Sequence, residues 1–183
     1  SEMCIRDSLT VVFDSDEAVK SGSGFVSANA QALQQYDLLS VTPTTEAAFQ
    51  HACITLSELK PFSIDIISLD LAAAPRLPFY LKRSTVGAAL ANGVVFEITY
   101  GAAVANTQDT PDVSAARRNL FAGARDLLRA TNGKGVIISS SALDALGIRA
   151  PYDVMNLAAL MGMTPNAAKD AISTTCLLYT SDA

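Results

Sequence analysis

The sequence predicts an α/β fold built on a mainly parallel sheet. Three observations lead to this class: short apolar runs rich in Val, Ile and Leu, helical stretches between them, and a regular spacing. The five β-like runs cover residues 9–13, 36–41, 64–71, 94–100 and 135–139. They begin roughly 28 to 40 residues apart, which is the spacing of βα units. A chain of this kind places parallel strands side by side and covers them with helices.

The composition of these runs predicts strands that are buried on both faces. Most of the runs are apolar almost throughout, with no alternation between apolar and polar residues. That pattern is typical of a parallel sheet with helices on both sides. Periodicity alone does not distinguish an open doubly wound sheet from a closed (β/α)8 barrel. Five runs are too few for a closed barrel, but truncation of the chain would explain the missing strands.

The helical stretches follow the strands and have recognisable ends. We expect helices over residues 44–56, 85–92, 113–130, 151–161 and 165–173. The second of them stops before Gly93, a common residue at a helix C-terminus. Thr164 offers an N-cap to the last one, and Pro165 suits its first turn. The polar insertion over residues 103–111 is expected to be a surface loop.

Composition limits the class of protein. The chain has 183 residues, half of them hydrophobic, and its 13 Lys and Arg against 18 Asp and Glu give a net charge of −5. This composition suits a globular domain rather than a disordered chain, and we expect no membrane partner because no apolar run reaches the length of a span. Cys4, Cys53 and Cys176 are too far apart for a CxxC metal site, which indicates a reducing compartment.

Both ends of the chain look foreign to the rest. The segments SEMCIRDS at residues 1–8 and CLLYTSDA at residues 176–183 resemble translated sequencing adaptors. We therefore expect a single native domain over residues 9–175, from a gene that is cut at both ends, and leave the two ends out of the fold prediction.

The residues needed for several kinds of catalysis are absent. His51 is the only histidine, and the sequence has no HExxH, GxSxG, Walker A or GxGxxG pattern. We therefore expect no metal, no cofactor and no catalytic residue. Asp65, Asp70 and Glu97 lie in or at the ends of predicted strands, where barrel enzymes place catalytic groups. An internal salt bridge or a capped loop explains these acids equally well.

Positive charge is concentrated in the middle of the chain. Residues 76–134 hold eight Lys and Arg against four Asp and Glu, although the whole chain is acidic. Such a region is a modest electrostatic footprint for a polyanion, and ordinary scatter of charge is the alternative. The cations are Arg76, Lys82, Arg83, Arg117, Arg118, Arg125, Arg129 and Lys134.

The predicted helix over residues 113–130 organises part of this charge. Its apolar residues share one side at 100° per residue. Arg118, Arg125 and Arg129 fall on the opposite side, where they could meet successive backbone phosphates. A solvated helix surface without a partner is the alternative.

Arg117 differs from the other cations of this helix because it projects into the apolar sector. A buried guanidinium is costly unless it is paired. We therefore favour an ion pair with Glu97 or Asp70 over the alternative that Arg117 leans out toward a ligand.

The segment over residues 75–83 combines two prolines with adjacent aromatics and cations. Phe79 and Tyr80 could stack on bases while Lys82 and Arg83 hold phosphates. The alternative is that one aromatic plugs the end of the sheet and that the cations are simply solvated.

A second loop, RAPYDV at residues 149–154, has the same composition. It supplies Arg149 and Tyr152, followed by an aspartate that opens the next helix. Two such loops make a binding surface more credible than either one alone.

Five blocks of this sequence also occur together in a known family. LPFYLKRSTV, FEITY, ARRNL, GKGVIISSSA and RAPYDVMNLAALMGM, in this order and spacing, resemble the thirty-kilodalton protein subunit of ribonuclease P, which eukaryotic ribonuclease MRP shares. The resemblance covers nearly all of residues 9–175. The chain departs from the family at Gly101 and Ala102, where Ser-Pro is usual, and at Ala150, where glycine is usual.

The resemblance implies a (β/α)8 TIM-barrel-like fold, truncated here at the N-terminus and at the C-terminus. It implies a non-catalytic RNA-binding subunit of a ribonucleoprotein that removes the 5′ leader of precursor tRNA, with the catalytic centre in the RNA. The implied partners are the RNA of ribonuclease P or MRP, precursor tRNA, and other protein subunits, including a small one. The implied location is the nucleus or nucleolus in a eukaryote and the cytoplasm in an archaeon. The alternative is a metal-dependent phosphoesterase, or another small-molecule enzyme, on a TIM-barrel scaffold.

The basic and aromatic positions and the resemblance together give one set of candidate RNA- or partner-binding residues. Lys82, Arg83, Arg117, Arg118, Lys134 and Arg149 match basic positions of the family, and Phe79, Tyr80 and Tyr152 match its aromatics. Arg76, Arg125 and Arg129 are added from the charge pattern alone.

Overall fold

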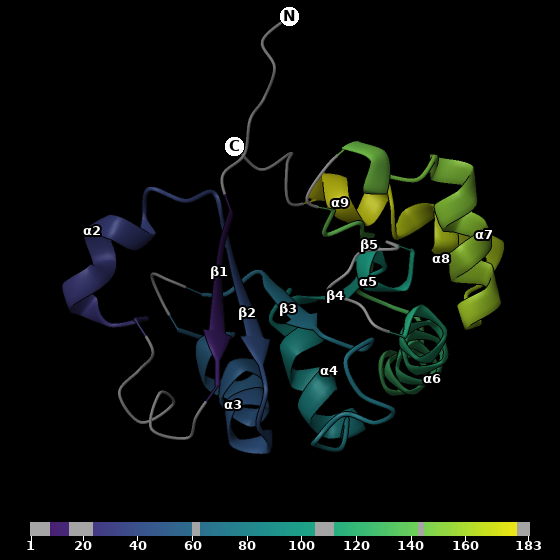
Figure 1. Cartoon of the computed structure of the whole chain (residues 1–183). Coiled ribbons are helices and arrows are strands. Elements are labelled where there is room, and N and C mark those ends of the chain that lie inside the picture. The colour runs from purple at the N-terminus through teal and green to yellow at the C-terminus, as the bar shows by residue number, and fades with distance from the viewer. Residues whose placement is uncertain (1–7, 15–23, 60–62, 105–111, 143–144, 179–183) are drawn as a thin grey trace, which may run out of the picture. The chain divides into compact units, whose positions relative to one another are not determined.

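The fold is described from a computed structural model, which covers residues 8–14, 24–59, 63–104, 112–142 and 145–178. The chain divides into two compact units. The first comprises residues 1–68, 78–80 and 84–95, and the second comprises residues 69–77, 81–83 and 96–183. Figure 1 labels the elements, and each unit is described by itself.

The strands of the first unit run parallel to one another. They are β1 (Ser8–Phe13), β2 (Leu38–Pro43) and β3 (Ile66–Leu69), of which β3 ends at the first residue of the second unit. Thr10 lies opposite Ser40 in the ladder between β1 and β2, and Ser40 lies opposite Ile66 in the ladder between β2 and β3. This order follows the chain, as expected for successive βα units.

The first unit also contains five helical segments in its described residues, of which α3 contacts β2. They are η1 (Ser27–Asn29), α2 (Ala30–Leu33), α3 (Glu46–Gln50), the π-helix η2 (His51–Leu56) and α4 (Arg83–Ala91). The Thr45 hydroxyl caps α3 by accepting the Ala48 N–H at 3.2 Å. Phe49 and Leu56 are buried in the core. The helices predicted over residues 44–56 and 85–92 are confirmed, the first as α3 continued by η2.

The second unit pairs two parallel strands and carries the longest helix. Its elements are β4 (Val95–Thr99), α5 (Gly101–Val104), α6 (Val113–Thr131), β5 (Val136–Ser139), η3 (Ala145–Gly147), α7 (Pro151–Met161), α8 (Pro165–Asp170) and α9 (Thr174–Leu178). Phe96 lies opposite Val136, and Thr99 lies opposite Ser139. Helix α7 packs against both α6 and α8 (Figure 1).

Local signals set the ends of the later helices. Pro151 occupies the first turn of α7, and Gly162 ends it with φ of 110°, a left-handed conformation that favours glycine. The Thr164 hydroxyl accepts the Ala167 N–H at 3.3 Å at the start of α8. The predicted helix over residues 151–161 is confirmed with the same bounds.

The expectation that the strands are buried on both faces is wrong for β1 and β3. Along β1, Thr10 and Val12 are exposed, and Val12 keeps 57% of its surface in contact with solvent. Along β3, buried Ile67 and Leu69 alternate with half-buried residues. An apolar run indicates that a strand can be buried, but whether each face of the strand is buried depends on which other elements cover that face.

The predicted surface loop over residues 103–111 is wrong at its start. Ala103 and Val104 belong to the short helix α5, and Ala103 is buried. The rest of that range, residues 105–111, lies outside the described residues, and so does Cys4. Of the two end segments set aside above, Ser8 begins β1 and Cys176 lies in α9.

The α/β class with parallel strands is confirmed. In the described part of the chain, no helix has the length and apolarity needed to span a membrane.

Candidate nucleic-acid interface

Helix α6 is the element that presents most of the candidate cations. The Asp112 carboxylate begins the helix by accepting the Ala115 N–H at 2.9 Å. Asn132 ends it in a left-handed conformation with φ of 54°. Its buried side includes Leu120 and Leu127, both fully enclosed in the second unit. The predicted core side of this helix is therefore confirmed.

Arg118, Arg125 and Arg129 form an exposed ridge on the opposite side of α6. At a rise of about 1.5 Å per residue, the steps along the helix axis are about 10 Å from Arg118 to Arg125 and about 6 Å from Arg125 to Arg129. The Asp126 carboxylate approaches Arg129 at 3.6 Å, but both side chains are mostly exposed, so the pair is weak. Within the described residues, the guanidinium groups of Arg118 and Arg125 have no ion-pair partner.

Arg117 lies on one flank of this ridge. Its Nε donates a hydrogen bond to the Ala103 carbonyl at 2.8 Å, and the side chain is exposed. The favoured ion pair with Glu97 or Asp70 is therefore wrong as far as the described residues show. A backbone carbonyl satisfies one donor of Arg117 and leaves its positive charge uncompensated.

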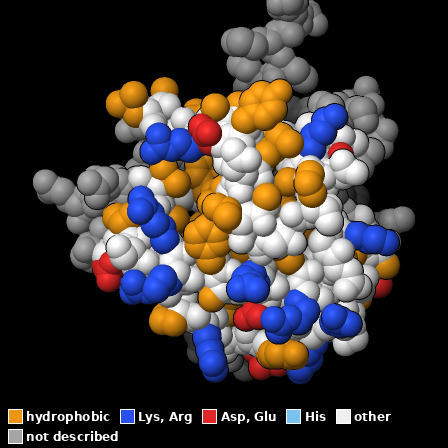
Figure 2. Space-filling model, turned by 90° about the vertical axis from the view of Figure 1, so that its right-hand side faces the viewer, with side chains coloured by type: hydrophobic (Ala, Val, Ile, Leu, Met, Phe, Trp, Pro, Cys, Tyr) orange, Lys and Arg blue, Asp and Glu red, His pale blue; other side chains and the backbone are white. Residues whose placement is uncertain are grey.

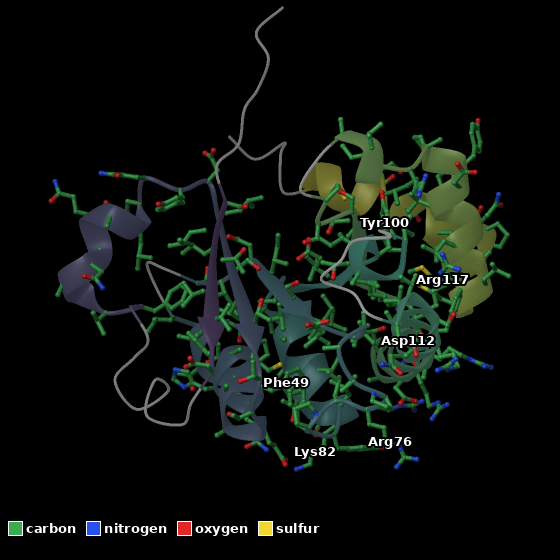
Figure 3. All side chains as sticks on the ribbon, in the orientation of Figure 1. Phe49, Arg76, Lys82, Tyr100, Asp112 and Arg117 are labelled. Atoms are coloured by element: carbon green, nitrogen blue, oxygen red, sulfur yellow. The ribbon has the colours of Figure 1, made fainter. Side chains whose placement is uncertain are left out.

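Arg76 lies on the other flank. The loop that carries it is fixed to α6, because the Asn119 side-chain amide donates to the Ala72 carbonyl at 3.1 Å. Leu71 of the same loop packs directly against α6 at Gly123. Arg76 follows as an exposed residue, and Figure 3 shows Arg76 and Arg117 on opposite sides of α6. The ridge and its two flanks form one basic surface, which we call the α6 surface.

The two aromatics of the segment over residues 75–83 have different environments. Phe79 is 7% exposed, and its ring stacks on Phe49 with centroids 4.8 Å apart and an interplanar angle of 17°. Tyr80 is 75% exposed. Phe79 therefore fills the core of the first unit, and only Tyr80 presents a ring that a base could stack on.

Lys82 and Arg83 are exposed and stand at the start of α4. The positive end of the helix dipole lies at the N-terminus, so cations there strengthen a local positive potential instead of stabilising the helix. Such an arrangement favours an anionic ligand.

The remaining candidates lie around the ends of α6 and α7. Lys134 is exposed just after the turn that ends α6. The backbone N–H of Arg149 donates to the Tyr100 hydroxyl at 3.1 Å, which fixes the segment before α7. Tyr152, in the first turn of α7, is 79% exposed. Figure 2 shows Lys and Arg side chains spread over the side of the molecule on which α6 and α7 lie, with apolar side chains between them.

Two of the three acids considered as catalytic candidates, Asp65 and Asp70, accept hydrogen bonds from backbone amides. Asp65 accepts the Leu39 N–H at 2.8 Å, and burial raises the pKa of its carboxyl. Asp70 accepts the Ala73 N–H at 3.1 Å and thereby closes a turn. In the ranges that the structure describes, no three His, Cys, Asp or Glu side chains gather as a metal site would require.

Burial shifts the pKa of two titratable groups of the first unit, the buried Cys53 and the half-buried His51. Burial raises the pKa of the Cys53 thiol to about 12, so the thiolate is scarce at neutral pH. Burial also lowers the pKa of His51, which favours the neutral imidazole.

Sequence reasoning missed the contacts that position the cations. The acceptors for Arg117 and Asn119 are backbone carbonyls, and the acceptor for the Arg149 N–H is the Tyr100 hydroxyl. Backbone carbonyls carry no sequence signal, because every residue has one. The tyrosine in FEITY could have been noted as a possible partner, but nothing in the pattern indicates which amide it would meet.

Comparison with known proteins gives a consistent result. A family model described as RNase P subunit p30 matches residues 7–180. Mouse ribonuclease P protein subunit p30 is 36% identical over 149 residues, which cover 81% of this chain and 50% of the mouse protein.

Two yeast proteins are also similar. The probable ribonuclease P protein subunit 3 of Schizosaccharomyces pombe is 32% identical over 78% of this chain and 54% of its own length. The ribonuclease P/MRP protein subunit RPP1 of Saccharomyces cerevisiae is 27% identical over 76% of this chain and 42% of its own length. The chain thus spans about half the length of the mouse and fission-yeast relatives.

Proposed function

Because the chain belongs to the ribonuclease P subunit p30 family, we propose that it binds RNA as a non-catalytic protein subunit of ribonuclease P. The RNA is that of ribonuclease P or of ribonuclease MRP, and the reaction that it supports is the removal of the 5′ leader from precursor tRNA. The catalytic centre lies in the RNA, and this chain supplies binding and positioning. A phosphoesterase or another small-molecule enzyme is not favoured.

The α6 surface is the observation that carries this proposal. Arg118 and Arg125 hold exposed guanidinium groups without an ion-pair partner in the described residues, and Arg76 and Arg117 extend the charge to both sides. Asp126, beside Arg129, is the one carboxylate that the described residues pair with this surface, so the cations outnumber it and maintain a local positive potential on an otherwise acidic chain. Each contact between a guanidinium and a phosphate releases condensed counterions from the RNA.

The exposed aromatics of each unit offer contacts to bases in addition to phosphates. Tyr80 and Tyr152 each present most of a ring to solvent, and an unpaired base can stack on such a ring. Phe79 acts indirectly, because its stack on Phe49 supports the segment that carries Tyr80. The remaining candidate cations contact further phosphates. They are Lys82, Arg83, Lys134 and Arg149.

The wider setting follows from the same family. We propose a TIM-barrel-like fold for this protein. We also propose that it assembles with other protein subunits of the ribonucleoprotein, including a small one. The location would be the nucleus, and the nucleolus in particular, if the source is a eukaryote, and the cytoplasm if it is an archaeon.

The test is binding to the cognate ribonuclease P RNA over a series of salt concentrations. A plot of the logarithm of the binding constant against that of the salt concentration has a slope of about −0.7 to −0.9 per phosphate contact. Arg118→Ala should make this slope shallower by about one contact, and the triple change of Arg118, Arg125 and Arg129 to Ala by about three.

Lys169→Ala is the matched control, because Lys169 is an exposed cation on α8 outside the α6 surface. It should leave the slope as it is. Equal slopes for the wild type and the triple variant, with unchanged circular dichroism, would contradict the assignment of phosphate contacts to α6.

A further inference from the structure

Tyr100 is a buried tyrosine to which RNA binding assigns no direct role. It follows β4 and is 3% exposed, so its ring is not available for stacking on a base. Its hydroxyl accepts a hydrogen bond at 3.1 Å from the backbone N–H of Arg149, which lies 49 residues further along the chain. A buried hydroxyl that holds the backbone of an exposed cation can influence a ligand through that cation.

The backbone of Tyr100 is fixed on both sides. Its N–H donates to the Ser139 carbonyl at the end of β5 at 3.1 Å, and its carbonyl accepts the Ala103 N–H of α5 at 3.0 Å. The next residue, Gly101, lies so close to the end of β5 that a side-chain carbon there would collide with the Ser140 carbonyl. Because the ring is also enclosed in a packed core, the Tyr100 hydroxyl has a defined position.

The segment that carries Arg149, residues 145–150, is not held by buried side chains. Its exposed residues are Ala145, Leu146, Ile148, Arg149 and Ala150. A segment that buries so little apolar surface depends on its backbone contacts for its position, and it opens easily when such a contact is lost. The hydrogen bond to the Tyr100 hydroxyl is one of these contacts, and it joins the segment to the buried end of β4.

The backbone around Tyr100 also holds Arg117. The Ala103 carbonyl accepts the Nε–H of Arg117 at 2.8 Å, and the Ala103 N–H is bonded to the Tyr100 carbonyl. Figure 3 labels Tyr100 and Arg117, which both belong to the second unit. The hydroxyl of Tyr100 thus holds the segment of Arg149, whereas its backbone carbonyl holds α5 and with it Arg117. Removing the hydroxyl alone therefore tests the Arg149 contact alone.

We propose that Tyr100 is a positioning residue for RNA binding, and that its hydroxyl acts by holding the backbone of Arg149 where the guanidinium meets a phosphate. A segment that is already fixed has less conformational entropy to lose when RNA binds. Loss of the hydroxyl frees the segment, and RNA must then order it at a cost in affinity. This inference rests on the proposed function, in which Arg149 is one of the cations that contact phosphates.

The test is Tyr100→Phe, which removes the hydroxyl and keeps the ring in the core. Without RNA, this variant should speed amide hydrogen exchange in residues 145–150 by about two- to tenfold, because the Arg149 N–H loses its acceptor. With ribonuclease P RNA, it should raise the dissociation constant by about two- to tenfold at a fixed salt concentration. Tyr36→Phe is the matched control, because Tyr36 lies in the first unit and is not a candidate residue. It should change neither quantity.

A double-mutant cycle separates positioning from a general loss of stability. Arg149→Ala should weaken RNA binding by itself, and in that background Tyr100→Phe should cause no further loss, because no guanidinium remains to be positioned. In the background of Arg118→Ala, Tyr100→Phe should cause its full loss, because Arg118 is positioned by α6. A merely structural role of Tyr100 would give equal losses in the two backgrounds.

Three results would each overturn the role of Tyr100. They are unchanged hydrogen exchange in residues 145–150, an unchanged RNA dissociation constant for Tyr100→Phe, and equal losses in the two backgrounds of the cycle. The triple α6 variant, measured beside them, distinguishes the two proposals. If its salt slope is shallower than that of the wild type, only the role of Tyr100 has failed. If its slope is the same, the assignment of phosphate contacts to α6 has failed as well.

Discussion

Replacing Phe79 and Tyr80 one at a time should separate a core residue from a binding residue within two adjacent positions. Phe79 is 7% exposed and stacks on Phe49, whereas Tyr80 is 75% exposed. Phe79→Ala removes a buried ring and leaves a cavity against Phe49, which costs about 3–5 kcal/mol of unfolding free energy. Tyr80→Ala removes little buried surface and should change that free energy by less than about 0.5 kcal/mol.

Urea unfolding followed by circular dichroism measures both effects. With a slope of about 2–3 kcal/mol per molar urea, Phe79→Ala should lower the midpoint by about 1.5 M. Tyr80→Ala should leave the midpoint in place but weaken RNA binding, since one stacked base contributes about 1–3 kcal/mol. Equal midpoints for the two variants, or a larger loss for Tyr80→Ala, would refute the assignment of Phe79 to the core.

Further changes test packing, charge and burial elsewhere. Gly87→Ala should stabilise the protein by about 0.5–1 kcal/mol, because a methyl group there meets nothing within 4 Å in helix α4. Gly123→Ala should instead destabilise the protein by about 1–2 kcal/mol, because the added carbon would lie 3.0–3.1 Å from Leu71. Thermal melting of both variants measures the two opposite shifts in melting temperature. Equal shifts would contradict the close packing of Leu71 on Gly123. Asp65→Asn tests a carboxyl whose pKa burial raises above its ordinary value of 3.8. The folded state therefore binds the proton of Asp65 more tightly than the unfolded state does. The contribution of Asp65 to the free energy of unfolding is then most favourable below pH 3.8 and is lost as the pH rises through the folded pKa. The free energy of unfolding of Asp65→Asn, relative to that of the wild type, should therefore increase as the pH rises through the folded pKa, as urea unfolding at each pH would measure. A decrease would contradict the raised pKa of Asp65. Cys53, with a pKa of about 12, should resist alkylation at pH 8 in the folded protein and react once urea unfolds the chain. Mass spectrometry of the labelled peptides measures both reactions. Rapid labelling of the thiol in the folded protein would contradict its burial.

The sequence predicts best those features that depend on local signals. Helix α7 has the predicted bounds because Pro151 and Gly162 act on their own backbone positions. The buried and exposed sides of α6 follow from a period of 3.6 residues and need no knowledge of neighbours.

Features that depend on tertiary contacts were harder to predict. Phe79 and Tyr80 both carry large rings that could fill a core, and it is the stack on Phe49 that identifies Phe79 as the buried one. The partner of Arg117 is the carbonyl of Ala103 in a helix that is too short to have a periodic pattern. Val12 belongs to an apolar run and is still exposed, because coverage of a strand depends on elements elsewhere in the chain.

The most direct test of RNA binding at the α6 surface is crosslinking from within it. Ala122 is exposed on the ridge between Arg118 and Arg125, so a photo-reactive side chain placed there should crosslink to ribonuclease P RNA on irradiation. The same group placed at exposed Gln34, in the first unit, is the control and should crosslink much less. Crosslinking at Ala122 that excess unlabelled RNA abolishes is the predicted result. No crosslinking at Ala122 under conditions where the RNA is bound would contradict the account.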